Sequence, residues 1–94
     1  MPVFRLDPVI DWLDDPSWVA SKIKEACWII ARDEADARQQ LQDIALKMVD
    51  VVLGRKILYS PWLSVRLTQC AEDASPPVSM KEGIVWTISG KTYS

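Results

Sequence analysis

The sequence contains no histidine, and this absence removes several kinds of chemistry at once. Histidine is the commonest general base near neutral pH, the usual partner of a serine or cysteine nucleophile, and a frequent ligand of transition metals. A catalytic site in this chain would have to use carboxylates, a lysine or a thiol with a shifted pKa. The three glycines stand alone, so neither common phosphate-binding glycine loop is present.

Long basic runs and long apolar runs are also missing. The 94 residues carry 11 Lys and Arg against 13 Asp and Glu, a formal net charge of −2. Because phosphate binding needs several cations on one face, we predict no nucleic-acid binding, and a patch of Arg55, Lys56 and Arg66 is the less favoured alternative. No stretch approaches the roughly 20 apolar residues of a membrane span, and residues 1–5 do not resemble a secretion signal. We therefore expect a cytoplasmic protein with no membrane partner.

Cysteine is scarce, with only Cys27 and Cys70 in the chain. In a cytoplasmic protein we expect both to be free, partly buried thiols. A disulfide, a redox pair or half of a zinc site shared between subunits stays open as an alternative, although there is no C-x-x-C spacing. The acids from Asp11 to Asp15 lack the alternation and the glycine of a calcium loop, and we assign them to capping and turns. We predict no metal and no cofactor.

Apolar residues are abundant. They make up 49% of the chain and include five tryptophans, which is enough for a core without disulfide or metal staples. A chain this short supports only one such core. We therefore predict a single domain over residues 1–94.

The clearest local signal is the end of the apolar run 26–31 at Arg32-Asp33. Trp28 and its two following isoleucines favour a strand, whereas Asp33 and the acids after it are typical of a helix N-terminus. Apolar residues then recur every three or four positions, which predicts a helix over 33–53 that stops at Gly54. A strand followed directly by a helix favours an α+β fold over a helical hairpin.

Shorter patterns predict the remaining elements. Alternation of Leu63, Val65 and Leu67 with polar residues predicts a strand over 63–70, which we expect to pair antiparallel with a last strand over 84–89. The other expected elements are a strand over 2–7, a helical turn over about 16–22, a turn over 59–62 and a loop over 71–81. Together they predict a small, mostly antiparallel sheet of three or four strands, packed by one long helix.

The tryptophans are the best candidates for binding a partner, because large amphipathic rings anchor interfaces. Trp12, Trp18 and Trp62 stand beside turns and prolines, where a ring is often only half covered. We predict a partner-binding patch of Tyr59, Trp62 and Arg66. The polar helix face, which we expect to be solvated, holds Arg38, Gln39, Gln42 and Asp43.

Three segments resemble a group of short bacterial proteins of unknown function. That group shares an acid-Pro-x-Trp-x-Ala-Ser segment, an acid-x-x-Ala-Arg helix start and a Ser-Pro-Trp turn. The matching segments here are 15–21, 33–38 and 60–63. The resemblance implies no activity, but it favours a strand and then a helix over 26–53.

These observations predict a non-enzymatic protein-interaction module. A small sheet covered on one side leaves an edge or a face that self-association would cover, so we expect a homodimer. The alternative is a small enzyme or ligand-binding protein that uses Cys27, Cys70 or the acids of 11–15, and nucleic-acid binding ranks third.

Overall fold

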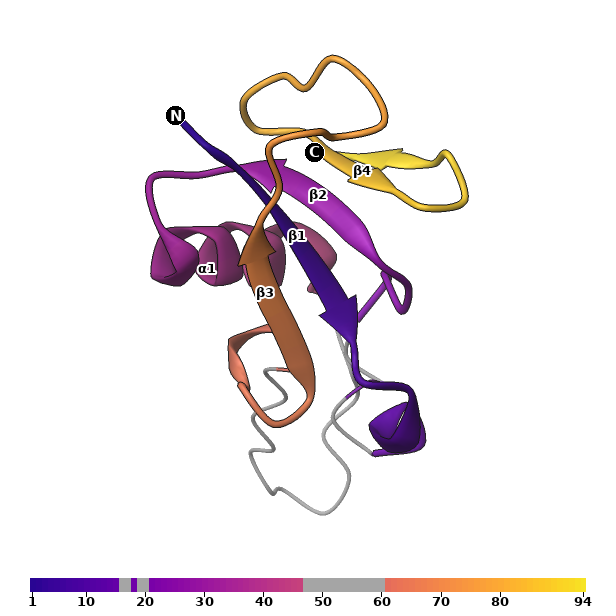
Figure 1. Cartoon of the computed structure of the whole chain (residues 1–94). Coiled ribbons are helices and arrows are strands. Elements are labelled where there is room, and N and C mark those ends of the chain that lie inside the picture. The colour runs from indigo at the N-terminus through magenta and orange to yellow at the C-terminus, as the bar shows by residue number, and fades with distance from the viewer. Residues whose placement is uncertain (16–17, 19–20, 47–60) are drawn as a thin grey trace.

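A computed structural model describes residues 1–15, 18, 21–46 and 61–94, and it is an α+β fold with one helix behind an open sheet (Figure 1). The sheet has five strands rather than the three or four expected. The strands are β1 (Val3–Pro8), β2 (Cys27–Ile30), β3 (Thr68–Glu72), β4 (Val85–Thr87) and β5 (Thr92–Tyr93). The helices that lie wholly within the described residues are the α-helix α1 (Glu34–Ala45) and the 3₁₀ helices η1 (Ile10–Trp12) and η4 (Pro61–Leu63).

The strands lie in the order β3-β1-β2-β4-β5, and every neighbouring pair is antiparallel. The predicted pairing of the strands around 63–70 and 84–89 is therefore wrong, because β1 and β2 lie between them. Periodicity shows that a segment is extended but not which strand lies beside it. The first strand of the chain is an interior strand, between β3 and β2, and both free edges of the sheet come from later segments.

The junction between β2 and α1 confirms the predicted strand-to-helix step. The carboxylate of Asp33 accepts a hydrogen bond from the Asp36 backbone N–H at 2.8 Å, which caps the helix. The Asp36 carboxylate in turn accepts from the Arg32 backbone N–H at 3.0 Å. This hydrogen bond holds the pKa of Asp36 below its ordinary value. The two carboxylates fix the point at which the extended chain begins to coil.

The helix is shorter than predicted at its C-terminal end. It ends at Ala45, and Leu46 has an extended ψ of 127° and forms an isolated bridge with Ser21. The apolar pattern continues past this point, so periodicity alone overestimated the helix. Residues 47–53 and the stop expected at Gly54 lie outside the described residues, as does most of the helical turn expected over 16–22 and the first half of the turn over 59–62.

The segment 63–70 is only partly a strand. η4 and a following turn occupy residues up to Leu67, and β3 begins at Thr68, where the side-chain hydroxyl donates to the Pro61 carbonyl at 2.8 Å. Of the three alternating apolar residues only Leu67 is buried, and Val65 is 76% exposed. The alternation therefore reflects a turn rather than a strand facing a core. β3 also extends two residues into the predicted loop 71–81, to Glu72.

The last predicted strand is confirmed in part and gains a partner. β4 covers Val85–Thr87 of the expected 84–89, and it turns back into β5, which the sequence pattern did not indicate. Gly90 makes the turn with φ at +90°, a conformation that favours glycine. A strand of two residues is too short to produce a recognisable alternation.

The hydrophobic core fills the space between α1 and one face of the sheet. Phe4, Leu6, Ile29 and Val85 extend from the sheet, and they pack with Trp18 and Trp62 from the loops. The helix contributes Ala37, Leu41 and Ala45, all at most 1% exposed. α1 lies behind β1 and β3 in Figure 1, so the viewer looks at the face of the sheet without a helix.

Candidate functional site

Trp62, the centre of the predicted partner patch, is fully buried. Its ring meets Trp18 edge to face, with ring centroids 5.1 Å apart, and its indole N–H donates to the Ser21 hydroxyl at 2.9 Å. Arg66 is exposed, and Tyr59 lies outside the described residues. The structure thus does not bring the ring of Trp62 to the surface beside Arg66, and a partner-binding role for this set stays a prediction.

The tryptophan that is exposed in this region is Trp12. The residue is 43% exposed, and the Arg66 guanidinium lies over its ring at 5.2 Å from the centroid. Arg66 also forms an ion pair with Asp15 at 3.5 Å. Of the three tryptophans beside turns, the half-covered environment is confirmed only for Trp12. The available signal was the acids close to Trp12, at Asp11 and at 14–15, since no acid stands near Trp62 in the sequence.

Arg38 is buried, contrary to the expectation of a solvated helix face. Only 6% of it is exposed, and the guanidinium donates to the backbone carbonyls of Trp62 at 3.0 Å, Ser64 at 3.3 Å and Thr68 at 2.8 Å. Its Nε donates to the Glu34 carboxylate at 3.1 Å. Gln42, one turn further along the same face, is also buried. This side of α1 binds the chain after Pro61 instead of water.

The three segments that carry the resemblance meet at this cluster. Trp18 and Ser21 come from the first segment, Arg38 from the second and Trp62 from the third, and the contacts just described join them. These contacts hold the ends of the core together. In this chain these residues thus take part in packing the core.

The two cysteines lie on the helix-facing side of the sheet, one on each side of Leu6. Leu6 pairs with Cys27 in β2 and with Cys70 in β3. The Cα atoms of the two cysteines are therefore two strand spacings apart, roughly 9–10 Å, which is too far for a disulfide. Both are free, as expected. Cys27 is fully buried and Cys70 is partly buried.

Both thiols are held in the protonated form. Burial raises the pKa of Cys27 far above its ordinary value, and burial raises the pKa of Cys70 to about 11. Since the thiolate is the nucleophile and the metal ligand, neither cysteine is activated at neutral pH. Among residues 1–15, 18, 21–46 and 61–94, no three acids or thiols are grouped to hold a metal ion.

The face of the sheet without a helix carries a row of large side chains across neighbouring strands. Arg5 pairs with Trp28, and Trp28 pairs with Trp86. The Arg5 guanidinium lies over the Trp28 ring at 5.0 Å from the centroid, and its Nε donates to the Asp7 carboxylate at 3.0 and 3.1 Å. That hydrogen bond raises the pKa of Arg5. Arg5 thus covers one face of the Trp28 ring.

Asp73 anchors the loop between β3 and β4 to this row. Its carboxylate accepts from the Trp28 indole N–H at 2.9 Å and from the Ser75 backbone N–H at 2.9 Å. Both bonds favour the charged form, so the pKa of Asp73 lies below its ordinary value. The loop then arches beside the β4–β5 hairpin, as Figure 1 shows. Trp28 is only 5% exposed.

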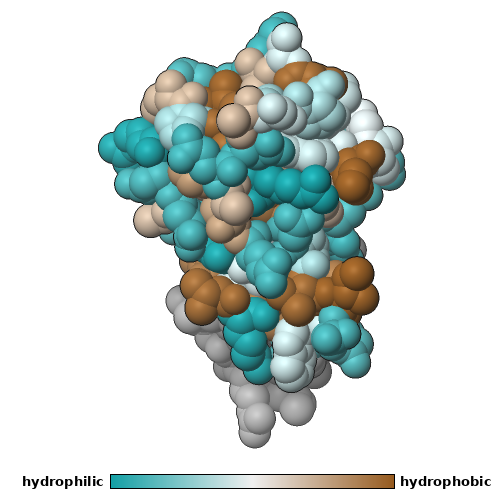
Figure 2. Space-filling model, in the orientation of Figure 1, coloured by the Kyte–Doolittle hydropathy of each residue, from teal (hydrophilic) through white to brown (hydrophobic). Residues whose placement is uncertain are grey.

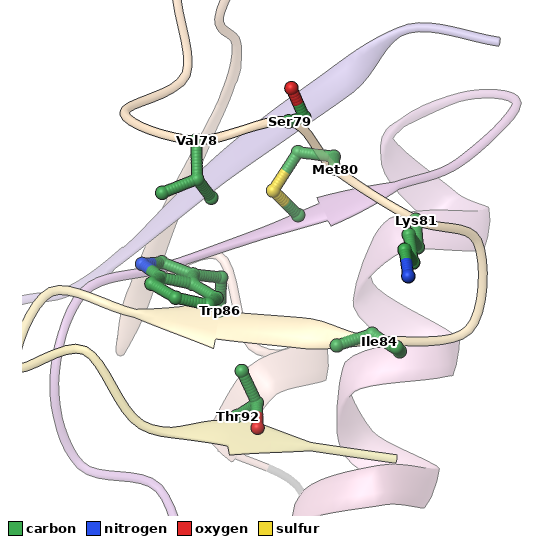
Figure 3. A pocket seen from close by; sticks show the side chains of 7 residues that line it. All are labelled: Val78, Ser79, Met80, Lys81, Ile84, Trp86 and Thr92. Atoms are coloured by element: carbon green, nitrogen blue, oxygen red, sulfur yellow. The ribbon is translucent and has the colours of Figure 1, made fainter.

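A pocket of about 210 Å³ lies between this loop and the hairpin (Figure 3). Val78, Met80 and Lys81 reach into it from the loop, opposite Ile84 and Trp86 of the hairpin segment. Its wall is completed by Ser79 and Thr92. The Trp86 ring is half-buried. The pocket is apolar, with one cation and two hydroxyl groups among its lining side chains.

The rest of this face is largely hydrophilic. Figure 2 shows separate brown patches divided by teal surface. The most exposed large apolar side chains among the described residues are Ile10 at 81% and Val65 at 76%. Ile10 lines two shallow hollows with Asp7 and Pro8, one of which also reaches Ile88. The hollow that reaches Ile88 combines apolar side chains with charges of both signs, whereas the other has only acidic charges.

β3 forms one free edge of the sheet. The Asp73 N–H donates to the Val3 carbonyl and the Val9 N–H donates to the Leu67 carbonyl, so the odd-numbered residues here direct their backbone groups at β1. The even-numbered residues direct theirs away from β1. The outward groups of Thr68 are used, because its N–H donates to the Ser64 carbonyl and its carbonyl accepts from Arg38. Cys70 and Glu72 therefore carry the backbone groups that face away from the sheet.

Comparisons with protein-family models, with curated proteins and with solved structures found no match. Within the described part of the chain, no helix is long and apolar enough to cross a membrane. The resemblance to short bacterial proteins stays a prediction.

Proposed function

We propose that this chain is a non-enzymatic interaction module that forms a homodimer by pairing its β3 edges. The observation that carries the proposal is the edge at Cys70 and Glu72, whose backbone N–H and C=O groups point away from β1 and pair with no other described strand. Backbone N–H and C=O groups at an open sheet edge can pair with a strand of another chain. The protonated state of both thiols weighs against the alternative of an enzyme that uses cysteine.

The two free edges of the sheet differ in what they offer. β3 spans five residues, and two of them direct their backbone N–H and C=O groups away from the sheet, whereas β5 spans only two residues. Because the Thr87 N–H donates to the Lys91 carbonyl, Thr92 is the one β5 residue that points its groups outward. The longer edge gives more hydrogen bonds per partner, so β3 is the proposed contact.

A second copy fits this edge with a two-fold axis through Ala71. Antiparallel pairing then places Cys70 of each copy opposite Glu72 of the other, which makes a hydrogen-bonded pair on each side of the axis. The exposed Ala71 side chain is small enough for the closer, non-hydrogen-bonded position on the axis. Glu72 lies opposite a neutral residue, so the pairing avoids like charges directly across from each other.

The proposed location is the cytoplasm, and the two free cysteines support it. Thiols persist in reducing compartments, whereas secreted domains of this size usually pair their cysteines. No nucleic-acid or membrane partner is proposed.

Sedimentation velocity in the micromolar range tests the dimer. We expect the wild type to sediment as a dimer and Glu72→Pro to sediment as a folded monomer. Proline removes the outward N–H but leaves the ladder to β1 intact, because that ladder uses the odd-numbered residues. Glu72→Gln is the matched control: it removes the same charge, keeps the N–H and should remain dimeric.

Two outcomes would contradict the proposal. One is a wild-type chain that stays monomeric throughout the micromolar range. The other is a Glu72→Pro variant that keeps the dimer, which would move the contact to another surface. A far-UV circular dichroism spectrum matching that of the wild type ensures that the variant is compared as a folded protein.

A further inference from the structure

We propose that the pocket over Trp86 binds a small planar aromatic carboxylate. This inference is independent of the dimer, because the pocket residues lie in 78–92 and the proposed contact lies in β3. Three properties of the pocket support the inference: its shape, its charge and the fixed position of the loop that forms one wall.

The shape suits a flat ring of one or two cycles. The pocket encloses about 210 Å³, and a cavity of about 150 Å³ in another protein accepts benzene. The half-buried Trp86 ring presents a flat aromatic surface, and the Met80 side chain lies across the space from it (Figure 3). Aromatic rings stack offset on indole, and thioethers make favourable contacts with ring edges.

The charge favours an anion on that ring. Lys81 is the only charged side chain in the lining of this pocket, and in the part of the chain that the structure describes it has no ion-pair partner. The Ser79 and Thr92 hydroxyl groups point away from the space over Trp86 (Figure 3), so the Lys81 ammonium is the group that would bind the anion. An aromatic cation would meet Lys81 without any lining carboxylate to offset the repulsion.

The loop that forms one wall is fixed at both ends. The Asp73 carboxylate bonds the start of the loop to Trp28, and Pro76 and Pro77 restrict the backbone dihedral angles of the chain after Asp73. At the other end the Ile84 N–H donates to the Lys81 carbonyl at 3.4 Å, and Gly83 turns the chain with φ at +76°. A wall held in this way gives up little conformational entropy when a ligand enters.

The test is an NMR titration of the ¹⁵N-labelled full chain with indole-3-carboxylate. We expect saturable shifts at the Trp86 indole N–H and at the amides of residues 78–84. The neutral isostere indole-3-carboxamide should bind about two- to fivefold more weakly, which is the usual size of a solvent-exposed ion pair. Hexanoate, an anion without a ring, should bind more weakly than either indole.

Lys81→Met separates the charge from the pocket itself. It should abolish the preference for carboxylate over carboxamide while leaving the shifts at Trp86 in place. Lys22→Met, at an exposed lysine outside the pocket, should keep the preference. Equal binding of the two indoles to the wild type, tighter binding of hexanoate, or shifts confined to residues outside 78–92 would each overturn the proposal.

Discussion

At the scale of single residues, Arg38 joins α1 to the segment that follows Pro61. Replacement of Arg38 by methionine keeps the volume of the side chain but leaves three backbone carbonyls without their donor. Removing one side of a buried charged network costs about 3 kcal/mol or more. We expect the free energy of unfolding, measured by urea titration, to fall by about that amount.

Arg32→Met is the matched control on the same helix end. The Arg32 side chain is 76% exposed and, within the described residues, its one ion pair is with Asp36 at 3.7 Å, so its loss should change stability by about 0.5 kcal/mol or less. Equal effects of the two substitutions would show that the Arg38 contacts contribute little. Arg38→Lys should lie between them, because an ammonium group cannot reach three carbonyls in a fixed fork.

Burial of individual polar and aromatic residues was the least predictable feature at this scale. Arg38 stands on the polar face of its helix by sequence, and Trp62 stands beside a proline turn, yet both are buried. They are buried against each other, which depends on where η4 packs on α1. Local periodicity carries no information on a contact between residues 24 positions apart.

At the scale of elements, the loop from Asp73 to Lys81 depends on one carboxylate. Asp73→Ala removes the acceptor of the Trp28 indole N–H and of the Ser75 N–H. We expect faster hydrogen exchange at the Trp28 indole and at the amides of residues 78–81. Glu82→Ala removes an exposed charge from the turn that follows this loop and should leave these exchange rates unchanged. Equal rates in Asp73→Ala and the wild type would contradict the anchor.

The same anchor should depend on pH in a defined direction. The folded pKa of Asp73 is lowered from 3.8, so the carboxylate contributes its full stabilisation above the unfolded value. That contribution is lost as the pH falls through the lower folded value. Exchange at the Trp28 indole, corrected for intrinsic rates, should therefore be slow at neutral pH and accelerate only below about pH 4.

The elements themselves were predictable where a capping residue accompanied the pattern. Asp33 identified the start of α1 to within one residue, and the apolar run before it identified β2. Elements were wrong where alternation stood alone, as at Leu63 and Val65, because a short alternation in sequence does not require an extended backbone, and here the segment forms a 3₁₀ helix and a turn. The Trp86 pocket could not be predicted, since it forms between a loop and a hairpin that share no sequence signal.

At the scale of the whole molecule, four of the five tryptophans lie on the two sides of the sheet and can report whether both sides unfold together. Trp18 and Trp62 lie in the helix-side core, and Trp28 and Trp86 lie on the opposite face. If residues 1–94 form a single domain, tryptophan fluorescence and far-UV circular dichroism should give coincident urea transitions. An early fluorescence transition without loss of helix signal would indicate that the loop and hairpin side unfolds separately.

The position of β1 has a consequence for synthesis on the ribosome. β1 precedes both of its neighbours in the chain, and its second neighbour, β3, follows some sixty residues later. A nascent chain that has completed β2 and α1 still has one flank of β1 unpaired. Because such distant pairing is slow to form, the emerging polypeptide is most prone to aggregation in the interval before Thr68–Glu72 leaves the exit tunnel.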